Sequence, residues 1–435
     1  MTVRAPAGET ELEATQRRKA ILAACIGNFI EYYDFVVYGY FASVIAKLFF
    51  PSSDTAASLL LTFAAFAVSY AARPIGALIF SHLGDKHGRR TPLAVSVILI
   101  AVSTTVIGLL PTHAQIGVAA PLVLTFARMV QGISVGGEYG GATSFISEYS
   151  ARRKRGYYTG WQTFTIGLAL FTGGAVATIL SASLSDAALS SWGWRLPFLV
   201  GVPLGLVGLY LRMRLDETPH FAAARANADV VRAPVLAGIK QQWRSLVIGM
   251  GVVVTPAICV YILFVYTPTY LGQVLGHSRF EAQAANLIAL AFYCALIPCF
   301  ARLSDRIGRK PLMVAGTVAL VAVTYPAFLM LGSGDFLVVV LGLCLLGLAF
   351  APHSAVMLAV VAELFPTTVR YTGLSLSLNI PVTLLGGTAP LIATALISWS
   401  GTTAAPAFFV IAGAIVSLVA AFAAPETAHS DLRTA

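Results

Sequence analysis

Twelve runs of apolar residues, each close to the length of a membrane-spanning helix, recur along the 435 residues of the chain. An α-helix of roughly 20 apolar residues crosses the about 30 Å of hydrocarbon in a bilayer. Only 11% of the residues are charged, whereas a soluble domain carries about 25%. The pattern predicts an all-α membrane protein with twelve transmembrane helices, near residues 20–46, 56–83, 92–111, 117–147, 157–181, 195–215, 245–274, 283–303, 311–331, 335–361, 371–398 and 404–424.

The basic residues predict the orientation of these helices. Of the 28 Lys and Arg residues, 23 fall in the two chain ends and in alternate gaps between runs, all on one side. Lys47, Arg195 and Arg279 fall on the other side, and Arg73 and Arg128 lie within the membrane. Cytoplasmic loops carry the excess of positive charge. We therefore expect a multi-pass protein of the plasma (inner) membrane with both termini in the cytoplasm. The net charge of +9 follows from this bias and does not indicate nucleic-acid binding.

Three matched signals indicate that the chain repeats one plan. The segment 83–90, LGDKHGRR, follows the second run, and the segment 303–310, LSDRIGRK, follows the eighth. Glu148 and Arg155 after the fourth run correspond to Glu363 and Arg370 after the tenth, and a Glu-Thr pair closes each half, at 217–218 and 426–427. These repeats predict two six-helix bundles, 20–215 and 245–424, a cytoplasmic linker over 216–244, and cytoplasmic tails over 1–19 and 425–435. Transporters built from parallel repeats bind their substrate near the midplane, between the halves.

The first apolar run carries an unusual polar stripe. Asn28, Glu31, Asp34 and Tyr38 are three or four residues apart, so they share one face of a helix. An ionised carboxylate inside a membrane is costly unless it is paired, solvated or protonated. Such groups usually mark the path of an ion or a substrate, and we expect this face to line one.

The doubled loop resembles the signature loop of the major facilitator superfamily. Further segments are similar to the metabolite:proton symporter family, over about residues 21–427: GNFIEYYDF from Gly27, RPIG from Arg73, QGISVGGEY from Gln131, WGWRLPF from Trp192 and DETP from Asp216. The small residue that begins the loop is usually Gly in the superfamily and is Ser81 and Ala301 here. The resemblance implies the major facilitator fold and proton-driven uptake of a small metabolite by alternating access. Known members carry citrate, 2-oxoglutarate, other organic acids, or proline and betaine.

The resemblance also implies a site of proton coupling. In related sugar–proton symporters an Asp of the first helix pairs with an Arg of the fourth, and Asp34 and Arg128 occupy these places here. Substrate binding near Arg128 would loosen the pair and let Asp34 take a proton. The alternative is a buried structural pair that fixes helix packing. Glu31 is either a second proton site or a carboxyl held by neighbouring hydroxyls, and Glu138 either takes part in coupling or bonds a neighbouring backbone.

Two intramembrane arginines favour a carboxylate substrate. The planar guanidinium groups of Arg73 and Arg128 suit carboxylates, although Arg73 could instead reach the membrane interface. The other candidates for the substrate cavity, for which packing or neutral hydrogen-bonding roles are alternatives, are Trp161, Gln162, Tyr266, Tyr270, His353 and Asn379. We expect proton symport of a small carboxylate metabolite such as a di- or tricarboxylate. The alternatives are symport of a zwitterion such as proline or glycine betaine and, less favoured, drug/proton antiport.

A second set of charges follows the membrane runs. We expect it at the cytoplasmic mouth, where ion pairs would hold an inner gate shut: Asp85, Arg89, Glu148, Arg155, Asp305, Arg309, Glu363 and Arg370. Positive-inside topology explains some of the bases but not the acids. No nucleophile with its base and no metal-ligand spacing appears in the sequence, which argues against an enzyme. We expect no cofactor, protons as the coupling ion, and a monomer in membrane lipid.

Overall fold

The computed structural model describes residues 11–88, 90–213 and 239–432. These ranges contain twelve helices long and apolar enough to cross a membrane, which confirms the predicted all-α fold. The spans of the first half are α1 (Glu11–Tyr40), α3 (Thr55–His87), α4 (Arg90–Leu109), α6 (Ala119–Tyr149), α7 (Arg155–Ser183) and α9 (Leu196–Met213). Short helices connect them: α2 (Ala42–Phe49), α5 (His113–Ile116), η1 (Arg152–Lys154), α8 (Asp186–Ser191) and η2 (Gly193–Arg195).

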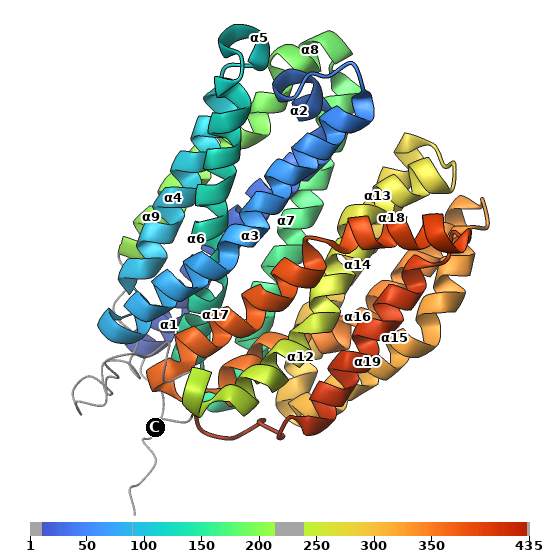
Figure 1. The fold of residues 1–435 in the computed structure, drawn as a ribbon. Helices are drawn as coiled ribbons and strands as arrows, with labels where there is room; N and C mark the ends of the chain where they lie inside the picture. The colour runs from blue at the N-terminus through green and yellow to red at the C-terminus, as the bar shows by residue number, and fades with distance from the viewer. Residues whose placement is uncertain (1–10, 89, 214–238, 433–435) are drawn as a thin grey trace, which may run out of the picture.

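Two spans of the second half are interrupted. The seventh begins as α12 (Trp243–Cys259) and continues through η3 (Val260–Tyr266), α13 (Thr267–Thr269) and η4 (Tyr270–Val274), of which η3 and η4 are π-helical. The eleventh passes from α17 (Arg370–Pro381) through the π-helical η6 (Val382–Gly386) to α18 (Ala389–Ser400), which turns away from the line of α17 (Figure 1). Interrupted helices often frame the substrate site of a transporter. The uninterrupted spans are α14 (Arg279–Ile307), α15 (Arg309–Leu331), α16 (Phe336–Leu364) and α19 (Pro406–Ala423), and the short η5 (Thr367–Val369) precedes α17.

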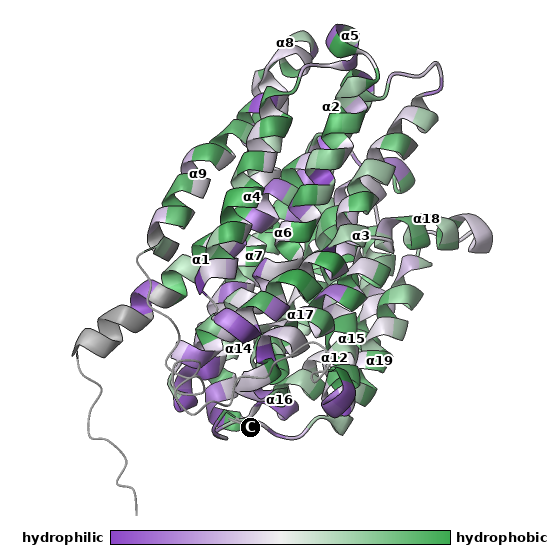
Figure 2. Cartoon of the chain, turned by 60° about the vertical axis from the view of Figure 1, so that its left-hand side comes forward, coloured by the Kyte–Doolittle hydropathy of each residue, from purple (hydrophilic) through white to green (hydrophobic). Residues whose placement is uncertain are grey.

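By their contacts the spans from α1 to α9 form one bundle and the spans from α12 to α19 form the other; they are coloured blue to green and yellow to red in Figure 1. The bundles meet along two interfaces, one formed by α7 with α14 and α16 and the other by α17 with α3 and α6. They lie together at the end where residues 425–432 lie, which we call the tail end. They diverge toward the opposite end, which carries α2, α5 and α8 (Figure 1). Figure 2 shows apolar residues over the outer helix faces and hydrophilic residues gathered at the tail end.

Glycines of α6 set how closely the helices approach. A Cβ at Gly132 or Gly136 would collide with the backbone of Ser69 or Arg73 in α3. Two further glycines, Gly140 and Gly141, face α17 and leave room for its side chains. Small residues of this kind let membrane helices pack backbone against backbone. The glycine-rich stretch of α6 therefore joins α3 within the first half and also seats α17 of the second half.

Candidate functional site

A small cavity lies between the two halves. Its volume is about 30 Å³, enough to hold water but far below the roughly 300–1,000 Å³ of a typical small-molecule pocket. A metabolite can enter only if the two halves or the interrupted helices move. The lining residues come from both halves and none is charged: Tyr32, Tyr139, Thr163, Ile166, Val253, Pro256, Ala257, Val260, Tyr261, Tyr293, Ser354, Met357 and Val382.

Four tyrosines dominate this lining. The rings of Tyr32 and Tyr139 meet edge to face with their centroids 5.8 Å apart. On the other side, the hydroxyl of Tyr293 lies 2.6 Å from Oγ of Ser354, and Tyr261 packs edge to face on Tyr70 at 5.6 Å. Tyr32, Tyr139 and Tyr293 are not among the site residues predicted from the sequence. Tyr32 and Tyr139 are each next in sequence to a selected glutamate, and that adjacency could have pointed to them.

Arg73 lies behind the tyrosine wall rather than on the cavity surface. Its side chain is buried, with 1% of the residue exposed, so it does not reach the membrane interface as the alternative role would require. The guanidinium stacks on the rings of Phe35 and Tyr70, 4.4 and 4.3 Å from their centroids. Its Nε and Nη1 atoms have no hydrogen-bond partner among the described residues. Two donor atoms of a buried cation are therefore unsatisfied in this conformation.

Asp34 and Arg128 are linked by a chain of hydrogen bonds instead of the direct ion pair that the resemblance implied. Thr104 Oγ1 donates to Oδ2 of Asp34 at 2.5 Å and accepts from Nε2 of Gln131 at 2.7 Å. Arg128 donates to Oε1 of Gln131 at 2.9 Å. The guanidinium also lies 4.4 Å from the ring centroid of Tyr38. The expectation of a direct pair is wrong for this conformation.

The second oxygen of Asp34 has an unusual environment. Oδ1 is buried and has no hydrogen-bond partner within the described part of the chain, and Asp34 as a whole is 1% exposed. Burying a polar oxygen without a hydrogen-bond partner costs free energy. Thr104 is therefore the contact between the acid and the chain to Arg128.

The other proposed coupling residues lie in different surroundings. Glu138 accepts a 2.6 Å hydrogen bond from Oγ of Ser96 in α4. Glu31 is 1% exposed and lies within electrostatic range of Arg73. His353 donates from Nε2 to the backbone oxygen of Val252 at 2.8 Å, so the ring is hydrogen-bonded, as its alternative role requires.

The remaining substrate candidates do not line the cavity. Gln162 accepts from Thr143 at 3.0 Å inside the first half, and the Trp161 ring packs edge-on against Phe164 at 5.1 Å. The hydroxyls of the two helix-seven tyrosines and the amide of the helix-eleven asparagine bond elsewhere: Tyr266 with Thr394 (3.2 Å), Tyr270 with the oxygen of Thr403 (2.8 Å) and Asn379 with the oxygen of Gly136 (2.9 Å). Asn379 thereby bridges the two halves.

The charges expected at a gate meet at the tail end and cross between the halves. Glu148 accepts from Nη1 of Arg370 at 2.9 Å, and Glu363 accepts from Nη1 of Arg155 at 2.8 Å. Arg309 is a second partner of Glu363 at 3.5 Å. The side chains of both cross-half pairs are at most 4% exposed. The two acids and two bases of the repeated motif are thus exchanged between the halves, and each pair joins one half to the other.

The two aspartates of the doubled loop cap helices of the opposite half. Asp85 accepts from the backbone nitrogens of Tyr371 and Thr372 at 3.2 and 2.9 Å, at the start of α17. Asp305 accepts from the nitrogens of Gly156 and Tyr157 at 3.0 and 2.8 Å, at the start of α7. A carboxylate at a helix N-terminus satisfies unpaired N–H groups and interacts favourably with the helix dipole. The predicted gate residue Arg89 lies outside the described residues.

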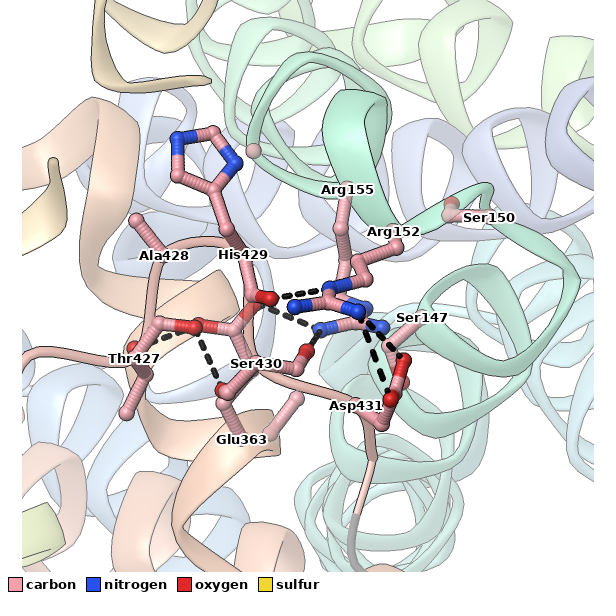
Figure 3. A network of polar contacts seen from close by, with 12 residues as sticks. Ser147, Ser150, Arg152, Arg155, Glu363, Thr427, Ala428, His429, Ser430 and Asp431 are labelled. Carbon is pink, nitrogen blue, oxygen red and sulfur yellow. Dashed lines mark hydrogen bonds and ion pairs between the residues drawn. The ribbon is translucent and has the colours of Figure 1, made fainter. Parts of the chain in front are cut away.

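A segment of the chain after α19, residues 425–432, crosses the tail end (Figure 3). Thr427 Oγ1 donates to Oε2 of Glu363 at 2.5 Å. Arg155 donates to the backbone oxygen of Ser430 at 3.4 Å, and Arg152 bonds the backbone oxygen of His429 and pairs with Asp431. The tail therefore binds the same acid and base that join the halves. Our sequence analysis assigned it no contact, although the repeated Glu-Thr pair marked its position.

Glu426 anchors this tail. Its carboxylate accepts from the backbone nitrogens of Arg309 and Lys310, both at 3.0 Å, and of Ala428 at 2.8 Å. Burial alone would raise the pKa of Glu426, but these three N–H groups and the charge of Arg309 together lower the pKa below its ordinary value of 4.5. The ionised form is therefore the one that holds the tail.

We expect the tail to detach in acid. Because the pKa of Glu426 is lower in the folded state, its contribution is complete above pH 4.5 and is lost as the pH falls through the lowered value. A spin label at Ser430→Cys should be immobile at pH 7 and become mobile as the pH falls through the lowered pKa of Glu426. In Glu426→Gln the label should be equally mobile at both pH values. A label that stays immobile in this variant would contradict the anchoring role.

Comparison with known families agrees with this architecture. Residues 20–242 match the family model described as "Sugar (and other) transporter", and residues 271–435 match "Major Facilitator Superfamily". The fold is similar to that of the proton:xylose symporter XylE bound to 6-bromo-6-deoxy-D-glucose, with a TM-score of 0.80, 17% identity, and 97% of this chain and 98% of that chain covered. The inward open conformation of XylE from E. coli gives a TM-score of 0.67 with 18% identity over 96% of this chain and 98% of that chain.

Several curated relatives cover almost the whole chain. The proline/betaine transporter of Escherichia coli (strain K12) is 36% identical over 98% of this chain and 87% of its own length. The glycine betaine/proline/ectoine/pipecolic acid transporter OusA of Dickeya dadantii (strain 3937) is also 36% identical, with the same coverage. The ectoine/proline transporter ProP of Corynebacterium glutamicum is 35% identical over 95% of this chain and 85% of its own length. The chain therefore belongs to the major facilitator superfamily and, within it, to the metabolite:proton symporter family of membrane transporters.

Proposed function

We propose that the protein imports a small zwitterion, of the class of proline and glycine betaine, together with protons. The observation that carries this proposal is the uncharged, tyrosine-rich cavity between the halves. A quaternary ammonium group binds well among aromatic rings, whereas a di- or tricarboxylate needs several cationic donors on the cavity surface. Relatives with 35–36% identity are named as proline, betaine and ectoine transporters, which favours the same substrate class.

This proposal replaces the di- or tricarboxylate that our sequence analysis favoured. That expectation required both arginines to serve as anchors in the cavity. Arg128 is occupied by Gln131, Ser69 and aromatic faces, and its bond to Ser69 Oγ is 3.2 Å long. Among the described residues, Arg73 has two donor atoms without a partner, Nε and Nη1, and its guanidinium lies over the Tyr70 ring, whereas Arg128 has only Nε without one. One guanidinium matches the single carboxylate of a zwitterion better than the two or three carboxylates of citrate or 2-oxoglutarate.

Protonation of Asp34 would supply the coupling step. In this proposal the acid takes up a proton when its side of the membrane is accessible and releases it after the halves reorient. Neutral Asp34 would no longer accept the hydrogen bond of Thr104 as strongly, because that 2.5 Å bond is made to a carboxylate oxygen. The weaker bond would alter the hydrogen bonds of Thr104 and Gln131, and through them the contact with Arg128. Arg128 lies close to the α1 and α3 faces behind the cavity.

The predicted orientation places the tail end on the cytoplasmic side of the inner membrane. The excess of Lys and Arg in the gaps at this end supports that orientation. In this orientation the crossed pairs Glu148–Arg370 and Glu363–Arg155 close the cytoplasmic gate. Alternating access would break both pairs and draw the opposite ends together, so the arrangement described here would be a state closed toward the cytoplasm.

Uptake into proteoliposomes tests the proposal. The panel contains labelled glycine betaine, proline, citrate, 2-oxoglutarate and a monocarboxylate, each with an inward proton gradient and with the gradient collapsed. We expect glycine betaine or proline to accumulate only with the gradient, while the di- and tricarboxylates do not accumulate. Accumulation of citrate or 2-oxoglutarate without any zwitterion would overturn the proposal. Equal zwitterion uptake in both conditions would remove the proton coupling.

A further inference from the structure

The unsatisfied donors of Arg73 and the tyrosine wall belong to one cluster. The guanidinium carbon lies 4.3 Å from the ring centroid of Tyr70, and the Tyr70 ring meets Tyr261 edge to face at 5.6 Å. Tyr261 lines the cavity. Arg73 is also within electrostatic range of the hydroxyls of Tyr32 and Tyr261. The cation therefore stands one layer of rings behind the cavity.

The layer between Arg73 and the cavity rests on an interrupted helix. Thr383 in η6 donates to the backbone oxygen of Tyr70 at 3.0 Å, and Gly386 of the same segment packs directly on the Tyr261 ring. The π-helical η6 has a less regular hydrogen-bond ladder than an α-helix. A shift of this segment would move Tyr70 and Tyr261 together. It would widen the cavity, and Arg73 would then face the new space.

The four cavity tyrosines offer a different kind of contact from Arg73. Tyr32 and Tyr139 come from α1 and α6, whereas Tyr261 and Tyr293 come from η3 and α14, so the rings approach from both halves. A methylated ammonium has no N–H donor and needs no acceptor, and aromatic rings bind it through their π faces. A secondary ammonium such as that of proline has N–H donors that need acceptors when it is buried. The acceptors of the lining side chains are hydroxyl groups, of which those of Tyr293 and Ser354 already bond each other.

We propose that Arg73 binds the carboxylate of the zwitterion while Tyr32, Tyr139, Tyr261 and Tyr293 enclose its ammonium, so that the site selects N-methylated substrates over proline. This inference rests on the proposed zwitterion function. It adds the orientation of the substrate in the site and the preference for N-methylated substrates that follows from it. The substrate would span from the first half at Arg73 to the second half at Tyr293. Its binding would therefore favour closure of the two halves around it.

Binding measurements on the full-length protein in nanodiscs test the ammonium end. Tyr261→Leu removes a ring, and the matched variant Tyr261→Phe removes only the hydroxyl. We expect Tyr261→Leu to weaken glycine betaine binding about tenfold and proline binding by less than about threefold. Tyr261→Phe should change both by less than about threefold. The ratio of the two dissociation constants is measured on one preparation, so a loss of folded protein cancels. An unchanged ratio of the two dissociation constants in Tyr261→Leu would overturn the proposed enclosure of the ammonium by the tyrosines. The same holds for Tyr139→Leu compared with Tyr139→Phe.

The carboxylate end has its own comparison. Arg73→Gln should weaken glycine betaine and proline each by about tenfold or more, because both have a carboxylate. Competition by tetramethylammonium, which has no carboxylate, should stay the same or become tighter in this variant. Parallel weakening of all three would indicate a structural role for Arg73 and overturn the assignment. If the unmodified protein accumulates zwitterions while these variants leave every ratio unchanged, this inference fails and the proposed function stands; if it accumulates none, the proposed function itself fails.

Discussion

Asp34→Asn is expected to abolish proton-driven accumulation while exchange of substrate across the membrane continues. One charge moving through about 100 mV releases about 2.3 kcal/mol, which corresponds to a roughly fifty-fold concentration ratio. The variant keeps the size and the hydrogen bond to Thr104 but cannot take up and release a proton. Internal substrate should therefore fall from about fifty-fold accumulation to equilibrium with the outside.

Two assays on the same proteoliposomes check this expectation. Net uptake with an inward proton gradient should be lost, whereas counterflow between labelled and unlabelled substrate should be retained. Asp186→Asn is the matched control, because this aspartate is exposed at the start of α8 and lies outside the predicted spans. Full accumulation by Asp34→Asn would show that another group carries the proton, with Glu31 as the next candidate.

Glu148→Gln is expected to separate the two halves at the tail end of the protein. Glu148 and Arg370 are both fully buried, with side chains 0% exposed. Removing one partner of a buried pair leaves the other charge without compensation and costs about 3–5 kcal/mol. That cost falls only on the state in which the halves meet here. The equilibrium should shift away from this state by roughly 10²–10⁴-fold, and transport should fall because the reorientation cycle is unbalanced.

Spin labels at Lys86→Cys and Arg306→Cys, in a cysteine-free background, measure this shift. Both sites are exposed at the tail end, one in each half. The distance distribution should move to longer values in Glu148→Gln and return partly toward the original in the double variant Glu148→Gln/Arg370→Gln. The control is Asp431→Asn, whose ion pair with Arg152 is exposed and contributes little. An unchanged distribution in Glu148→Gln would mean that the pair does not hold the halves together.

The two predictions differ in how far the sequence could lead to them. Asp34 stands out in the sequence because a carboxylate in an apolar run is rare, and no tertiary information is needed to select it. The sequence also selected Glu148 and Arg370, but only as members of repeated motifs. Glu148 meets Arg370 rather than Arg155, which is nearer in the sequence, because of how the two bundles face each other. A separation of more than 200 residues carries no local signal of such a contact.

The expected direct pair of Asp34 and Arg128 was wrong for a similar reason. The position of each residue on its helix is correct, since α1 and α6 do bring them near one another through Thr104 and Gln131. The packing of Arg128 on the rings of Phe35, Tyr38 and Phe66 decides where its charge lies. Such stacking depends on three residues from two helices and cannot be read from a motif.

The sequence alone determined the twelve spans, the two equivalent halves and the acids and bases that mark the closed end. These properties follow from local hydrophobicity and from repeated spacing, which act along the chain. The tertiary structure decided the exchange of ion pairs between halves, the course of residues 425–432 over the closed end, and the cavity of four tyrosines that no single motif contains. Each of these depends on side chains from helices far apart in the chain meeting at one place, and only the packing of the bundles brings them there.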